Sequence, residues 1–182
     1  RIQPLPDDGI LAGFTALPVP AQPGPWKLGL AELLGRRLTV RLPAGAQRDR
    51  LLVGLVTHQA QPLLKLGRLE EARGLLLRHL HCFEALKDAR LAGPFFLALA
   101  GAYGLLGEPG PAAVWLRRAA AESARSGDAT TLAMASHGLA LDCFWAGRFG
   151  EGIEAGRAAV DRLRKPRERR WIGQAMWGMS MN

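Results

Sequence analysis

Three glycines recur along this 182-residue chain at one interval of 40 residues: Gly67, Gly107 and Gly147. Each glycine ends a stretch whose apolar residues have helical spacing, and each is followed by a second such stretch. A glycine placed just after a helix adopts a positive φ without the strain that a Cβ would bring. The regular interval therefore predicts a tandem array of helical hairpins and restricts the fold to an all-α repeat architecture.

The predicted hairpins share their layout around the three glycines. Helices are expected at about 50–66 and 68–83, at about 94–106 and 111–126, and at about 130–146 and 149–163. Pro94 and Pro111 suit the first turn of a helix, where a missing N–H costs little. The repeats themselves are assigned to residues 53–86, 93–126 and 133–166, within a helical repeat domain that spans 48–182.

The ends of the chain differ from the hairpins. Residues 1–25 contain six prolines, which fix φ and remove backbone donors, so they are expected to form a proline-rich leader or linker. Residues 26–47 are expected to form an N-terminal helix and a loop. A partial fourth repeat is predicted at 173–182, and it stops before any turn glycine. An uncapped solenoid end suggests a piece of a longer protein, or an end that pairs with a partner or a second copy of the chain.

Further positions around the turn glycines repeat in the same register. Small residues precede the glycines by seven positions and follow them by five and twelve, and larger residues precede them by four. The residues seven positions before the glycines are Ala60, Ala100 and Ala140, and those five positions after them are Ala72, Ala112 and Gly152. The residues twelve positions after them are His79, Ala119 and Ala159, and the larger residues four positions before them are Leu63, Tyr103 and Cys143. This pattern resembles the tetratricopeptide repeat (TPR) family, whose paired helices approach closely where side chains are small. His79 and Gly152 depart from the pattern, so we expect local irregularity there.

The resemblance implies a TPR-like α-α superhelix with three full repeats and a partial fourth. The long interval is similar to that of helical regions in bacterial signalling ATPases, transcription activators and cyclase-linked proteins. In the resembled family, first-helix residues line an inner groove. The equivalent residues here are Thr57, Gln61, Lys65, Leu97, Met134, His137, Leu141, Phe144, Trp145, Gln174, Trp177 and Met181. Their aromatic and apolar character is typical of protein interfaces, although rings at such positions also pack between repeats.

The resemblance therefore favours a non-catalytic scaffold that binds a protein, a peptide or a neighbouring domain of the same chain. Chaperone-binding members hold a terminal carboxylate with a set of Lys and Asn residues at these positions, and this chain has no such set. A small-molecule effector sensor in a transcription regulator is the first alternative. Nucleic-acid binding ranks third. It would use the basic cluster at residues 162–170 and the net charge of +8, but a solvated loop between repeats is the favoured interpretation of that cluster.

No residue pattern in the sequence indicates an active site, a cofactor or a metal. His79, His81 and Cys82 are too closely spaced to converge from one helix, and no phosphate-binding glycine loop occurs. Two widely separated cysteines indicate reduced thiols, and every apolar stretch is too short to span a bilayer. We therefore expect a cytoplasmic protein that is not an enzyme.

Overall fold

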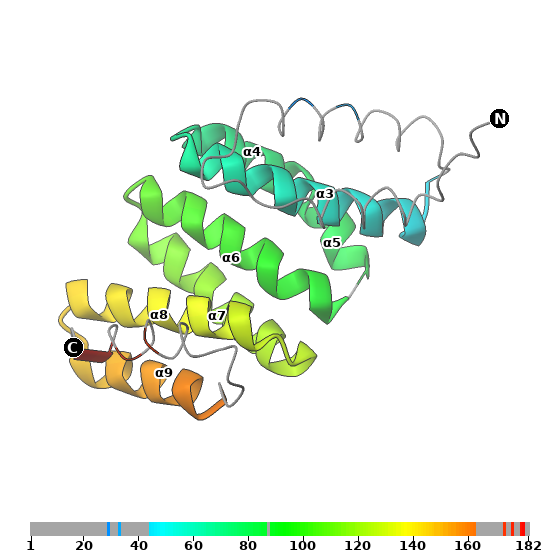
Figure 1. Ribbon diagram of the computed structural model, residues 1–182. Helices are drawn as coiled ribbons and strands as arrows, with labels where there is room; N and C mark the ends of the chain where they lie inside the picture. Colours follow the sequence, from blue (N-terminus) through cyan, green and yellow to red (C-terminus); the bar gives the residue numbers. More distant parts are fainter. Residues whose placement is uncertain are drawn as a thin grey trace. The chain divides into compact units, whose positions relative to one another are not determined.

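The computed structural model describes residues 44–86 and 88–162, together with the single residues 29, 33, 173, 176, 179 and 180 (Figure 1). These residues form seven helices and no strand, which confirms the all-α prediction. The proline-rich leader lies outside the described residues. So do most of the predicted N-terminal helix and most of the predicted fourth repeat, although the single residues described in both segments are helical.

The chain divides into two compact units, Arg1–Lys87 and Asp88–Asn182. In the first, α3 (Ala46–Lys65) packs against α4 (Leu69–Arg78) and α5 (Leu80–Leu86). The second contains α6 (Ala89–Leu105), α7 (Pro109–Ser126), α8 (Ala129–Trp145) and α9 (Phe149–Arg162). Helices that follow one another in this unit pack together in pairs, and α6 also contacts α8 (Figure 1).

The predicted turn glycines all end a helix with the same geometry. Gly67, Gly107 and Gly147 have φ of 74°, 78° and 70°. The N–H of the following residue donates to the carbonyl five positions before it, at 3.0 Å, 3.0 Å and 2.8 Å in the three turns. This is the Schellman arrangement, which satisfies carbonyl groups left over at a helix end. The three turns are therefore structural equivalents, as the 40-residue interval predicts.

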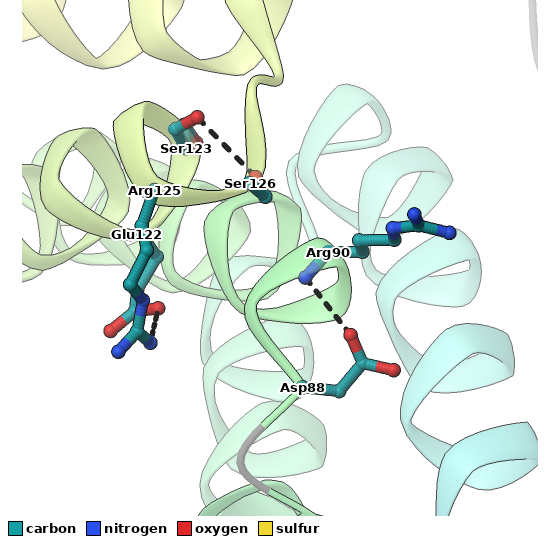
Figure 2. Close-up of polar contacts among 6 residues, drawn as sticks. All are labelled: Asp88, Arg90, Glu122, Ser123, Arg125 and Ser126. Atoms are coloured by element: carbon teal, nitrogen blue, oxygen red, sulfur yellow. Dashed lines mark hydrogen bonds and ion pairs between the residues drawn. The ribbon is translucent and has the colours of Figure 1, made fainter.

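The first helices of the second unit also begin alike. Asp88 precedes α6, and its carboxylate accepts a hydrogen bond from the N–H of Arg90 at 3.0 Å (Figure 2). Asp128 precedes α8 and accepts from the N–H of Thr131 at 3.0 Å. Such caps satisfy donors that the first helical turn leaves without an intrahelical partner. The two aspartates are again 40 residues apart, so these two hairpins share the start as well as the turn, whereas α3 follows Gly45 and has no side-chain cap.

The small residues of the repeat pattern lie in the helix interfaces. Ala60, Ala100 and Ala140 are buried, as are Ala72, Ala112 and Gly152 on the second helices. The second unit is further tightened by two helical glycines. A Cβ added at Gly93 would lie 2.2 Å from the Oγ of Ser123, and one at Gly138 would lie 2.9 Å from a methyl of Leu116. Helix α7 therefore meets α6 and α8 where neither has a side chain.

Three local predictions have different outcomes. The irregularity expected at His79 is confirmed, because α4 ends at Arg78 and α5 begins at Leu80. There the His79 Nδ1–H donates to the carbonyl of Leu75 at 2.9 Å. The irregularity expected at Gly152 is wrong, since α9 continues through it. The position predicted for Pro94 is also wrong: the Asp88 cap starts α6 at Ala89, so Pro94 lies inside the helix.

Candidate functional site

The predicted groove residues of the first unit lie on one side of α3. Thr57, Gln61 and Lys65 are four residues apart, which places them on one helix face. Gln61 and Lys65 are exposed. Thr57 is half-buried, and its hydroxyl donates to the carbonyl of Val53 at 2.7 Å. Two polar side chains of this face are thus accessible to a partner, whereas the Thr57 hydroxyl is already used within the helix.

The predicted residues of the second unit lie on α6 and α8, which contact each other. Leu97 on α6 and His137 on α8 occupy equivalent positions 40 residues apart, and both are half-buried. Leu141 and Phe144 are half-buried too, whereas Met134 is exposed. The predicted residues of α6 and α8 therefore lie on two helices that contact each other, and they are partly or fully exposed. Gln174, Trp177 and Met181 lie outside the described residues.

Trp145 differs from the other predicted residues because 80% of its surface is exposed. Its ring makes an edge contact with Phe144 at 5.1 Å between centroids, and Phe144 is 6.1 Å from the ring of Phe149. Edge-on aromatic pairs of this kind are favourable beyond the area they bury. The indole is thus held by a neighbour at the α8–α9 turn without being covered, and it does not pack between repeats.

A cleft of about 410 Å³ adjoins Trp145. Helix α7 contributes the residues Pro109, Gly110, Ala113 and Arg117. The end of α8 and the turn after it contribute Asp142, Trp145, Ala146 and Arg148. The volume lies within the range of roughly 300–1,000 Å³ that is typical of ligand sites. Apart from Trp145, no residue of this cleft is among those predicted from the sequence.

The two arginines of the cleft have different surroundings. Arg148 donates to Asp142 at 2.9 Å and to Glu151 at 3.1 Å, so two carboxylates neutralise it. The Asp142 side chain is 13% exposed, which screens this pair from solvent better than a surface pair. Arg117 is exposed and makes no hydrogen bond or ion pair within the described part of the chain. Among the charged groups of the cleft, Arg117 is therefore the one without a direct ion pair in the described part of the chain.

The cleft contains no group with the character of a nucleophile. Cys143 lies next to Asp142 and is buried. Burial raises the pKa of this thiol, and the positive charge of Arg148 only partly opposes the rise. Desolvation likewise raises the pKa of Cys82 in the first unit, with a further contribution from Asp49. Since the thiolate is the reactive form, both cysteines are expected to react slowly in the folded protein.

The remaining candidate groups do not form a site in the described residues. The Cys82 sulfur lies 3.2 Å from Nε2 of His81, and the His79 ring donates a hydrogen bond to the carbonyl of Leu75 on α4. Across residues 44–86 and 88–162, no three His, Cys, Asp or Glu side chains gather as a metal would require. Beyond Arg162, the basic cluster lies outside the described range. No helix of the described chain is long and apolar enough to cross a bilayer.

Comparison with known proteins adds no relative. No protein-family model matches this chain, and no curated protein sequence matches it either.

Proposed function

We propose that this chain is a non-catalytic interaction scaffold of the TPR type, with three full repeats and a partial fourth in an α-α superhelix. The observation that carries the proposal is the equivalence of the three turns at Gly67, Gly107 and Gly147. Repeated hairpins of this design build extended surfaces from which partners are bound. The partner is a protein, a peptide or a neighbouring domain of the same polypeptide.

The face of α6 and α8 supports this role. Its residues are apolar or aromatic, and Met134 and Trp145 are exposed in a helix pair that is otherwise well packed. Large apolar and aromatic side chains of this kind are enriched in the energetically important parts of interfaces. By resemblance, the chain would be the helical region of a larger bacterial regulatory protein in the cytoplasm.

A small-molecule effector sensor is the second candidate, and the cleft beside Trp145 favours it because its volume suits a small ligand. Nucleic-acid binding through a basic surface stays third. These candidates differ in what stabilises the protein. A ligand that binds only the folded chain raises its melting temperature, so a small molecule acting alone would support the sensor.

In the test, proteins that are cross-linked to this chain are identified by mass spectrometry. Each partner is then purified, and its affinity for the chain is measured by calorimetry. The double variant Met134→Ala, Leu141→Ala removes two apolar side chains from the α8 face. We expect it to weaken binding by about tenfold or more, as at an interface hot spot. Val114→Ala is the matched control, since Val114 is an exposed apolar residue on the neighbouring helix α7.

The scaffold proposal fails if no purified protein binds saturably while a sugar, nucleotide or amino acid stabilises the fold. It also fails if the double variant and the control bind equally well. Circular dichroism of both variants establishes that the helices are intact.

A further inference from the structure

We propose that the cleft between the first turns of α7 and the α8–α9 turn binds an acidic linear peptide. A carboxylate of the peptide pairs with Arg117, and a neighbouring apolar side chain packs on the ring of Trp145. The inference rests on the proposed scaffold function and names a site and a ligand class within it. The site shares Trp145 with the α6 and α8 face, but α7 forms its other wall and supplies Arg117.

The apolar half of this recognition comes from Trp145. An indole that is 80% exposed leaves a large apolar surface in water, and covering it on binding is favourable. The edge contact with Phe144 restricts the ring before any ligand arrives. A restrained ring loses less conformational entropy on binding than a mobile one. Trp145 therefore has the properties of an interface anchor.

The charged half comes from Arg117. It is exposed and lacks an ion pair in the described part of the chain, whereas Arg148 already has two carboxylate partners. A guanidinium presents parallel donors that match both oxygens of a carboxylate. An arginine without a direct ion pair beside one exposed ring matches an acidic residue that is next to an apolar one.

The charge arrangement favours a peptide over a nucleic acid. Binding of a nucleic-acid strand draws on several cations that follow successive phosphates. In the cleft, Arg117 is the one arginine without a carboxylate partner among the described residues, because Arg148 is paired with Asp142 and Glu151.

The test begins with selection of a display library of random linear peptides against the full chain. Enriched sequences should contain Asp or Glu beside an aromatic or aliphatic residue. The best synthetic peptide is then titrated by fluorescence anisotropy against the wild type, Arg117→Glu and Trp145→Ala. We expect each variant to weaken binding by about tenfold or more. A peptide with Lys in place of its acidic residue should regain affinity for Arg117→Glu.

The repeat supplies a matched control for each variant. Arg157 is exposed on α9 at the position equivalent to Arg117, 40 residues on. Leu105 is 61% exposed at the end of α6, at the position equivalent to Trp145. Neither residue lines the cleft. Arg157→Glu and Leu105→Ala should therefore bind the peptide within about twofold of the wild type, because their changes lie outside the contact.

Three results would overturn the cleft proposal. The first is enrichment of peptides without acidic residues, or no enrichment at all. The second is a peptide whose affinity is unaffected by Arg117→Glu and Trp145→Ala. If Met134→Ala, Leu141→Ala abolishes that affinity, the scaffold function stands and only the cleft assignment fails. The third is an oligothymidylate that binds with the same dependence on Arg117 and competes with the peptide, which would assign the cleft to nucleic acid.

Discussion

The contact between Gly93 on α6 and Ser123 on α7 gives a strong prediction about stability. Ser123 is fully buried near the end of α7, and its side-chain Oγ has no hydrogen-bond partner in the described part of the chain. The substitution Gly93→Ala would place a Cβ 2.2 Å from that oxygen. Non-bonded heavy atoms are most stable at about 3.5–4.0 Å, so the buried Ser123 side chain must leave its rotamer or one of the two helices must shift.

Two opposing effects determine the size of the change. Alanine in a helix interior is more favourable than glycine by about 1 kcal/mol. Overpacking of a well-packed core costs about 1–3 kcal/mol, and an overlap of this size belongs at the upper end. We therefore expect Gly93→Ala to lower the free energy of unfolding by about 2 kcal/mol. In a chain of this length, that corresponds to a fall of about 4–8 °C in melting temperature.

The same geometry predicts that Ser123→Ala rescues the variant. Without the oxygen, the nearest atoms to the new Cβ are the Cβ of residue 123 and the Cγ2 of Thr131, both at 3.4 Å. In the Ser123→Ala background, Gly93→Ala should thus be stabilising by up to about 1 kcal/mol, from helix propensity alone. The coupling between the two sites would be about 3 kcal/mol, at the upper end for residues in direct contact.

The assay is urea unfolding of the four proteins in this cycle, followed by far-UV circular dichroism. Gly104→Ala is the control on the same helix, since its Cβ would meet only Ala112 at an ordinary distance of 3.9 Å. The packing argument is refuted if Gly93→Ala is as stable as Gly104→Ala. It is also refuted if Ser123→Ala restores nothing, because the oxygen is the atom in conflict.

Three further predictions concern the caps, the rings and the thiols. Asp128→Ala removes the cap of α8 and should cost about 1 kcal/mol, whereas Asp128→Asn keeps an acceptor and should cost less; equal urea midpoints would contradict the role of the cap. Arg118 lies 4.3 Å from the Phe96 ring centroid and 5.1 Å from that of Trp115. Arg118→Met should therefore lower the free energy of unfolding by about 0.5–1 kcal/mol in the same assay, and an unchanged urea midpoint would exclude a cation–π contribution. Burial raises the pKa of both cysteine thiols, so the unfolded chain ionises first and the free energy of unfolding should fall as pH rises above about 8.5. A double Cys→Ala variant should lose that part of the pH dependence, and an unchanged pH profile would contradict the shift.

The hairpins could be predicted from sequence because their information is local. A positive φ at a helix end needs glycine, and three glycines at one interval mark three ends. The same local logic was wrong at Pro94. Proline favours a first turn, but Asp88 lies six residues earlier and supplies a cap there, so α6 begins before the proline. Two start signals competed, and sequence spacing alone gave no way to rank them.

The cleft could be predicted only in part, because it depends on how two helices pair. Trp145 is predicted from its position in the repeat and lines the cleft, while its role in binding stays a prediction. Arg117 and Asp142 lie on different helices, and their approach depends on the register of α7 against α8. The close contact of Gly138 with Leu116 helps to set that register. A sequence search would find such pairs only by combining the 40-residue repeat with an assumed packing of neighbouring helices.

The start of α7 affects which ligand charge the cleft prefers. Proline occupies the first and third positions of this helix, and the N–H of Ala112 is already donated to Glu108. Among the first four residues of α7, only Gly110 has an N–H group that is not already donated. The backbone therefore contributes little to binding an anion, unlike the start of most helices. Preference for one ligand charge over another is thus encoded in side chains. Substitution at a single position could invert that preference while leaving the main chain as it is.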